Sequence, residues 1–188
     1  MYNIKFIEKK LKEENNFRLE HTLSVKDAAV ELAKIYNEEE NKAEIAALLH
    51  DYAKHYNKKK LFELINKNKI SVDRWERANP VLLHAPVGAF LAEKLFDIKD
   101  KNILNAIRYH TIGRPQMNTL EKIIFVADII EPGRDFPGVD LIRKKSKEDL
   151  DTSVKLVCDF TIKYNINKNR MIHPNTLLIR NEILEGEW

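Results

Sequence analysis

The sequence predicts an all-α protein built as a single domain. Apolar residues recur three and four positions apart through most of the chain, which is the period of a helix with one buried face. No run of strict apolar and polar alternation is long enough to indicate a strand. The 188 residues include only five glycines and six prolines, fewer than a fold with many tight turns would need. These observations favour long helices around one core.

Amphipathic segments follow one another along the whole chain, without an internal repeat or a domain linker between them. We therefore expect one domain over residues 1–188, with a core at about 17–131 and C-terminal helices over 139–188 packed on it. The segments with helical period are 4–11, 17–36, 42–50, 58–67, 87–96, 101–110, 119–130, 147–164 and a last one that Pro174 opens.

Asparagine, glycine and proline mark the breaks between these segments. Asn37 ends the second segment, Pro80 marks a break, and Pro86 suits the first turn of the helix that follows it. Residues 111–118 contain one glycine and one proline and predict a loop. The octet EPGRDFPG at 131–138 has two glycines and two prolines, which excludes a helix there.

Composition places the chain among ordinary globular proteins. The net charge of +3 and the pI near 8.8 suit an anionic substrate without requiring one. The lysines are spread along the chain, as on solvated helix faces, so we expect no nucleic-acid partner. Charges interrupt the N-terminal segment, and no stretch approaches ~20 apolar residues, so we expect neither a signal peptide nor a membrane partner.

The chain has one cysteine, Cys158, among apolar neighbours. An internal disulfide is therefore impossible, and a reducing cytoplasm is the expected location. The surroundings of Cys158 predict a small buried residue and no nucleophile.

Histidines and aspartates stand at unusual places in the apolar segments. His50 and Asp51 end the segment KAEIAALL, and Asp128 lies within IIFVADII. Any single histidine of this kind can be a hydrogen-bonded core residue, and the His-Asp pair alone arises often by chance. An ionised carboxylate within an apolar helix is costly unless it is paired or bound to a metal.

Taken together, these residues predict a metal site. The candidate ligands are His21, His50, Asp51, His84, His110 and Asp128. Imidazole and carboxylate groups suit Zn, Fe or Mn. Six protein ligands exceed what one catalytic metal takes while it keeps an open position, so two metals that share a carboxylate are expected.

The order of these residues resembles the H…HD…D pattern of the HD-domain superfamily. The stretches HDYAKHY, HAPVGA, YHTIGRPQM, FVADIIEPGR and MIHPNTL resemble its YqeK-like branch, the symmetric bis(5'-nucleosyl)-tetraphosphatases. The resemblance implies an HD-type helical bundle and a cytoplasmic enzyme that splits diadenosine tetraphosphate (Ap4A) into two ADP.

The resemblance also implies how the ligands divide. His21, His50, Asp51 and Asp128 would hold one metal, Asp51 would bridge, and His84 and His110 would hold the second. The family implies iron, whereas the residue types alone would equally allow Mn or Zn.

We expect a metal-bridging hydroxide to attack an inner phosphate, with cations aimed at the phosphate oxygens. The catalytic residues would be Asp51, Lys54, Asp128 and Arg134, because Lys54 lies one turn after His50 if that helix continues and Arg134 follows Asp128. The expected nucleotide and phosphate contacts are His21, Lys54, His84, His110, Thr111, Arg134, Arg170 and His173. Arg114 is a further cation of the same kind, and each cation has a solvated surface position as its alternative.

Three further residues carry weaker signals. His55 lies in a polar stretch and is expected to be exposed. Tyr109 and Phe136 could stack on adenine, although core positions are the commoner use of such residues.

Other functions remain open at this point. HD proteins include nucleotidases, deoxynucleoside triphosphatases and cyclic-dinucleotide phosphodiesterases, and a fold does not determine a substrate. A metal-dependent nucleotide sensor without turnover, or an RNA-associated adaptor, is the alternative from another class. The presence of all six candidate ligands argues against an inactive enzyme, and the even charge distribution argues against an RNA module. The oligomeric state is left open, a homodimer included.

Overall fold

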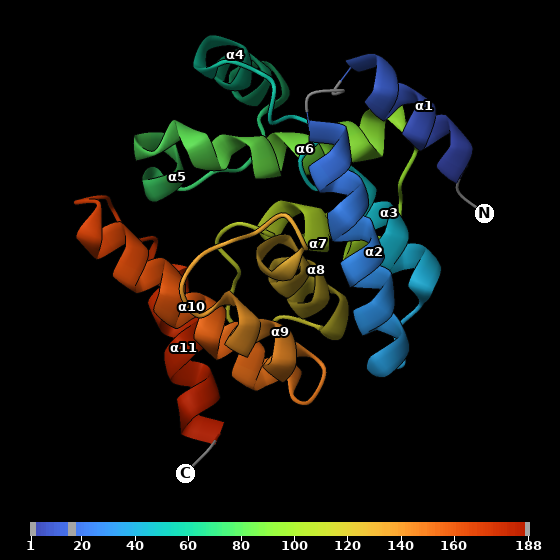
Figure 1. Ribbon diagram of the computed structural model, residues 1–188. Coiled ribbons are helices and arrows are strands. Elements are labelled where there is room, and N and C mark those ends of the chain that lie inside the picture. The colour runs from blue at the N-terminus through green and yellow to red at the C-terminus, as the bar shows by residue number, and fades with distance from the viewer. Residues whose placement is uncertain (1–2, 15–17, 187–188) are drawn as a thin grey trace.

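The computed structural model describes residues 3–14 and 18–186, which form helices and connecting turns without a strand (Figure 1). The all-α prediction is therefore confirmed. In chain order the elements are α1 (Ile4–Glu14), α2 (Leu19–Ile35), α3 (Glu40–Leu49), α4 (Lys58–Asn68), α5 (Arg74–Ala78), the 3-10 helix η2 (Pro80–Leu83), α6 (His84–Leu95), α7 (Lys101–Tyr109), α8 (Thr119–Ile130), α9 (Val139–Ser146), α10 (Leu150–Asn167) and α11 (Pro174–Gly186).

The centre of the fold is made by α8 and by the helices that pack their buried faces around it. Helix α2 packs on α3 and α8, and α7 packs on α3, α6 and α8. Helix α8 buries a nearly continuous apolar run that includes Ile123, Ile124, Val126 and Ala127. A helix with so wide an apolar surface must be covered on most sides, so it lies in the middle with other helices around it.

The last three helices form a group beside α8, at the opposite end of the molecule from α4 (Figure 1). Helix α10 packs against α8, α9 and α11. One hydrophobic cluster includes Leu48 and Ile124 from the expected core segment and Val154 and Ile179 from the C-terminal helices. The C-terminal helices thus share their buried surface with the segment that holds the candidate ligands.

Three short elements were not among the predicted segments, namely α5, η2 and α9, the last of which lies before the segment expected at 147–164. Helix α5 has five residues, too few to show a helical period, and it is held by a capping box in which Asp73 and Glu76 exchange hydrogen bonds. Pro80 opens η2, so the break expected there is a turn of 3-10 helix. Phe17, which the sequence places in the second helix, lies outside the described residues.

The predicted breaks agree with the backbone. Asn37 adopts a left-handed conformation with φ of 52° after α2. Residues 111–118 and 131–138 contain no helix. Gly113 has φ of 61°, and a Cβ atom there would overlap Ile179 Cδ1 of α11. Glycine at this position therefore lets the 111–118 loop lie against α11.

Among the described residues, no helix has the length and apolar character needed to cross a membrane.

Candidate metal centre

The candidate ligands come from helix ends and one helix interior that converge on a single point. Helices α3 and α7 end immediately before His50 and His110, and α6 begins at His84. The remaining ligands sit on α2 (His21), directly after His50 (Asp51) and on α8 (Asp128). At a helix end the backbone turns, so His50 and Asp51 can face the same point although they are neighbours in sequence.

Asp51 is buried and faces four of the candidate histidine ligands. Its Oδ1 atom is 3.1 Å from His84 Nε2 and 3.5 Å from His110 Nε2. Its Oδ2 atom is 3.5 Å from His50 Nε2 and 3.8 Å from His21 Nε2. Asp51 therefore belongs to two groups whose ligand atoms lie within reach of one ion each, one with His21 and His50 and the other with His84 and His110.

Hydrogen bonds to the other ring nitrogen determine the tautomer of three histidines. Nδ1 of His50 is 2.6 Å from Ala47 O, and the corresponding distances are 2.6 Å for His84 to Val81 O and 2.8 Å for His110 to Ile107 O. A carbonyl oxygen only accepts, so each Nδ1 must donate. In the neutral ring, Nε2 then carries the lone pair that a metal requires.

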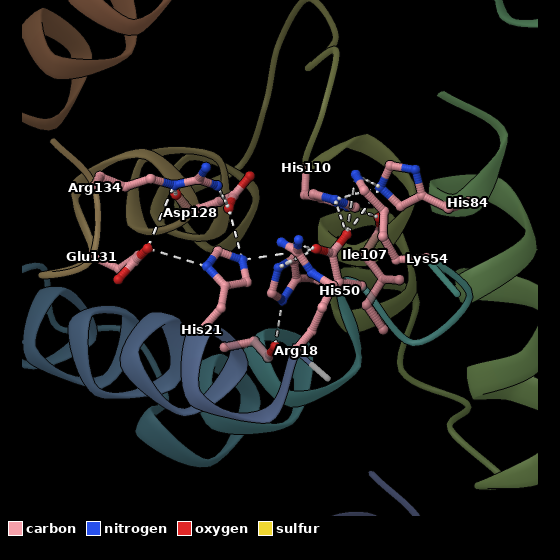
Figure 2. Close-up of polar contacts among 12 residues, drawn as sticks. Arg18, His21, His50, Lys54, His84, Ile107, His110, Asp128, Glu131 and Arg134 are labelled. Atoms are coloured by element: carbon pink, nitrogen blue, oxygen red, sulfur yellow. Dashed lines mark hydrogen bonds and ion pairs between the residues drawn. The ribbon is translucent and has the colours of Figure 1, made fainter. Parts of the chain in front are cut away.

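His21 is held in the same way by a carboxylate. Its Nδ1 lies 3.2 Å from Glu131 Oε1 (Figure 2). A histidine oriented by a carboxylate on one nitrogen and facing a metal with the other is a recurrent arrangement in metal sites. The four rings therefore all direct Nε2 toward Asp51.

Two observations fit a cation between these rings. The Nε2 atoms of His84 and His110 are 3.2 Å apart, although in both rings Nδ1 is the donor. Two lone pairs at this distance repel unless a positive charge lies between them. The buried Nε2 atoms of His21 and His50 have no hydrogen-bond partner among the described residues, and such orphaned buried groups are rare in native proteins. Neutral imidazole and carboxylate are suitable ligands for Zn, Fe or Mn.

Burial and charge set the protonation of the centre. Burial lowers the pKa of His84 to about 4 and also lowers the pKa of His110, so both rings are neutral at pH 7. Burial disfavours the charged form of Asp51, but the charge of His50 and the other histidines that face it keep the pKa of its carboxyl well below its usual range. His84 and His110 are therefore neutral and Asp51 is ionised at pH 7, whereas, despite burial, Asp51 and Asp128 raise the pKa of His50.

Asp128 stands beside the His21 and His50 group. Its Oδ1 atom is 3.2 Å from His21 Nε2 and 2.5 Å from Arg134 Nη2. Arg134 Nε also donates to the carbonyl of Asp128 at 2.8 Å. Despite the burial that opposes charge, His21, His50 and Arg134 lower the pKa of the Asp128 carboxyl. The charge that seemed costly within α8 is thus compensated at this end of the centre.

Lys54 lies at the other end. Its Nζ is 3.1 Å from His84 Nε2 and 3.6 Å from Asp51 Oδ1. Helix α3 ends at Leu49, so the turns after the helix, and no continuing helix, bring Lys54 to this point. The expectation that the helix continues from His50 to Lys54 was wrong, but Lys54 still reaches the centre.

Sequence reasoning missed Arg18 and Glu131. Arg18 Nη2 is 2.7 Å from Asp51 Oδ2, and Glu131 contacts His21 as described above. Arg18 precedes α2 by one residue, and Glu131 follows the last residue of α8. A helix end close to a candidate ligand is the signal that could have identified both, since the candidate ligands cluster at helix ends.

Other predicted contacts lie away from the six ligands. Arg114 pairs with the buried Glu121 at 2.7 Å, exposed Arg170 lies over the Tyr164 ring at 5.7 Å, and His173 Nε2 is 2.8 Å from Asp73 Oδ2. Within the described part of the chain, no hydrogen bond or ion pair links Arg114, Arg170 or His173 to the candidate ligands. Thr111 follows His110, and its Oγ1 is buried without a hydrogen-bond partner among the residues described.

Of the three weaker predictions, the one that His55 is exposed was wrong. His55 is half-buried, with edge contacts to Tyr52 and Tyr56 at ring distances of 6.4 and 4.2 Å, because the turns after α3 fold back onto these rings. Phe136 stacks on Phe160 at 4.0 Å. The guanidinium groups of Arg108 and Arg114 lie 5.0 and 5.5 Å from the centroid of the Tyr109 ring. The stacking on Phe160 fits a core position for Phe136.

Comparison with known proteins identifies the family. A family model described as "HD domain" matches residues 18–133. The "Bis(5'-nucleosyl)-tetraphosphatase, symmetrical" of Halalkalibacterium halodurans is 44% identical over 167 residues, 89% of each chain. Its counterpart of the same name in Bacillus subtilis is 43% identical over 166 residues, 88% of this chain and 89% of that one. A crystal structure of a "predicted HD superfamily hydrolase involved in NAD metabolism" from Clostridium acetobutylicum superposes with a TM-score of 0.94 at 42% identity and covers 99% of both chains. This chain, with its converging histidines and aspartates, belongs to the HD domain family.

Proposed function

We propose that this protein is a symmetric bis(5'-nucleosyl)-tetraphosphatase that hydrolyses Ap4A to two ADP with the help of two metal ions. The observation that carries the proposal is the position of Asp51, whose two oxygens face two separate pairs of histidine Nε2 atoms. The names of the relatives from Halalkalibacterium halodurans and Bacillus subtilis support this choice of substrate.

The residues of the centre divide between two metal positions. His21, His50, Asp51 and Asp128 would hold one ion, and Asp51, His84 and His110 would hold the other. Ions held in this way supply a nucleophile from water at neutral pH and neutralise charge that develops at phosphorus. Iron is our proposed metal, and the imidazole and carboxylate ligands also suit Mn and Zn.

The side chains around the centre would bind and orient the tetraphosphate. Lys54 at one end and Arg134 at the other would contact phosphate oxygens on both sides of the bond that breaks, and their contacts with His84 and Asp128 support this role. Arginine can contact two phosphate oxygens at once, whereas lysine acts as a point charge. Thr111, with its buried hydroxyl next to His110, is a further phosphate donor in this proposal.

The same proposal places the enzyme in the cytoplasm, with Ap4A as substrate and ADP as product. The single cysteine, Cys158, is fully buried and free, which fits a reducing compartment.

The test is a product analysis with metal counting. The protein is purified anaerobically, bound metals are measured, and Ap4A is incubated with it while the products are separated by ion exchange. ADP as the sole product supports the proposal. ATP plus AMP would keep a metal-dependent hydrolase but overturn symmetric cleavage, and nucleotide binding without turnover would favour a sensor.

Single substitutions test whether ADP formation depends on the residues of the centre. Asp51→Ala and Asp128→Ala should abolish ADP formation. Asp27→Ala is the matched control, because Asp27 also lies on a central helix but its side chain is exposed. Full activity of Asp51→Ala would refute the role of this centre.

A further inference from the structure

A cavity of about 230 Å³ opens beside the metal centre. Its walls include Lys54, Tyr56, Lys58, Pro80, Val81 and His84. Two of these residues, Lys54 and His84, also belong to the centre, and Figure 2 shows both at the opposite end from Arg134. We call this cavity the Tyr56 pocket. A ligand that extends from the centre in this direction enters it directly.

The walls of the Tyr56 pocket are mostly apolar. Val81 has 67% of its surface exposed, the largest value among the exposed large apolar residues of the described chain. The Tyr56 ring is half-buried and packs against the core, and burial raises the pKa of its hydroxyl. Tyr56 therefore offers an apolar ring face together with a protonated hydroxyl group, a combination that suits a nucleobase.

Positive charge lies at both ends of this apolar wall. Lys54 Nζ is 3.1 Å from His84 Nε2, toward the centre. Lys58 is exposed, its Nζ lies 6.0 Å from the Phe62 ring, and it has no carboxylate partner among the described residues. A phosphate chain that leaves the centre past Lys54 would meet Lys58 as its next cation.

The size of the pocket limits what it can hold. Pockets that enclose a whole drug-sized ligand measure about 300–1,000 Å³, so the Tyr56 pocket suits one end of a larger molecule. Cleavage at the central bond of a dinucleoside tetraphosphate places the middle of the substrate at the metals. One nucleoside must then extend toward Lys54 and the other toward Arg134.

We propose that the Tyr56 pocket binds one nucleoside of the dinucleoside substrate, with the base against Tyr56 and Val81 and Lys58 beside the adjoining phosphates. This proposal rests on the proposed function for the identity of the ligand. The pocket would let the enzyme distinguish a substrate with a base at both ends from inorganic polyphosphate.

The first experiment detects occupancy without turnover. In the variant Val81→Cys, a thiol reagent should modify the new cysteine only, because the native Cys158 is fully buried and its pKa is raised to about 12. The substitution keeps the Val81 carbonyl that accepts from His84 Nδ1. The probe ligand is the Ap4A analogue in which a methylene group replaces the central bridging oxygen, because this bond cannot be hydrolysed.

Saturating analogue should slow the modification of Val81→Cys at least about 5-fold, since a base stacked at this position covers the thiol. Inorganic tetraphosphate at the same concentration should slow it less than about 2-fold, because phosphates alone need not enter an apolar pocket. Leu178→Cys is the control, since Leu178 is 51% exposed on α11, and its modification should not change. Equal protection by both ligands, or no protection by the analogue, would overturn the proposal.

The second experiment uses the metal-loaded enzyme and Ap4A. Tyr56→Ala should raise KM about 10-fold with little change in kcat, the loss expected for one base stack, and Tyr56→Phe should restore most of it because the ring remains. An unchanged KM in Tyr56→Ala would argue against the pocket. If the native protein releases no ADP but Val81→Cys is protected by the analogue, the proposed function fails while the pocket stands. If the native protein releases ADP but the analogue does not protect Val81→Cys, the proposed function stands and the pocket proposal fails.

Discussion

Glu131 Oε1 lies 3.2 Å from His21 Nδ1, so the residue that directly follows α8 orients a ring on α2, 110 positions away in sequence. The other Glu131 oxygen accepts the Gly133 backbone N–H at 2.6 Å. Arg143 in turn donates to the backbone carbonyl of Glu131 at 3.0 Å and to that of Arg134 at 2.7 Å. Gly133 thereby holds the carboxylate that orients His21, and Arg143 of α9 holds the backbone of the loop that carries it.

Glu131→Gln should lower the affinity for metal by about 10–100-fold, the usual cost of removing a partner that orients a metal-bound histidine. The amide keeps the shape but loses the charge that favours donation from His21 Nδ1. Titration of the metal-depleted protein measures the effect directly. Glu121→Gln is the matched control, because Glu121 is also a buried carboxylate on α8 but pairs with Arg114. Equal metal affinity in Glu131→Gln and the native protein would contradict the prediction.

Metal stoichiometry should distinguish the shared carboxylate from a ligand of one group. The native protein should hold about two ions, as in two-metal hydrolases. His110→Ala removes a ligand from one group only and should leave about one ion. Asp51→Asn removes the carboxylate common to both groups and should leave less than one. Metal analysis after gel filtration gives these values, and two retained ions in Asp51→Asn would show that Asp51 does not bridge.

Asp73→Ala should destabilise the fold by about 1 kcal/mol, the typical value for loss of an N-cap. Asp73 caps α5 and accepts from His173 at 2.8 Å. Although burial opposes its charge, the backbone N–H of Glu76 and the ring of His173 lower the pKa of its carboxyl. Its folded pKa is therefore below its unfolded value, so its stabilisation is present above the unfolded pKa and is lost as the pH falls through the folded one.

Denaturant unfolding at two pH values measures this effect. The difference in unfolding free energy between the native protein and Asp73→Ala should be largest near neutral pH and should shrink at a pH below the usual range of an aspartate, about 4. A difference that grows on acidification would reverse the sign of the prediction. Asp97→Ala, at an exposed aspartate, should show no such dependence.

Gly113→Ala should destabilise the protein by about 1–3 kcal/mol, because a side chain would be forced into a left-handed conformation and against Ile179. The same change should lower activity, since the affected loop begins directly after His110. Gly186→Ala is the control, with open space around its position. Thermal unfolding of both variants, with Ap4A hydrolysis measured in parallel, checks this, and a Gly113→Ala protein as stable as the native one would refute it.

The sequence by itself determined the fold class, most helices and the candidate ligands. Helical period is a local property, so α8 could be predicted from its apolar run and the 131–138 loop from its glycines and prolines. Asp128 could be singled out for the same reason, because a carboxylate within an apolar helix needs compensation wherever the helix lies. The structure brings the six candidate ligands together, and their role as metal ligands stays a prediction that the stoichiometry test addresses.

Only the tertiary structure decided which groups surround these ligands. Glu131 and Arg18 look like ordinary charged residues at helix ends, and their importance comes from contacts with His21 and Asp51 that the folded chain creates. The half-buried position of His55 likewise depends on how the turns after α3 pack. Whether a residue lies in a helix follows from its neighbours in sequence, whereas the side chain that it contacts on another helix depends on how the whole chain packs.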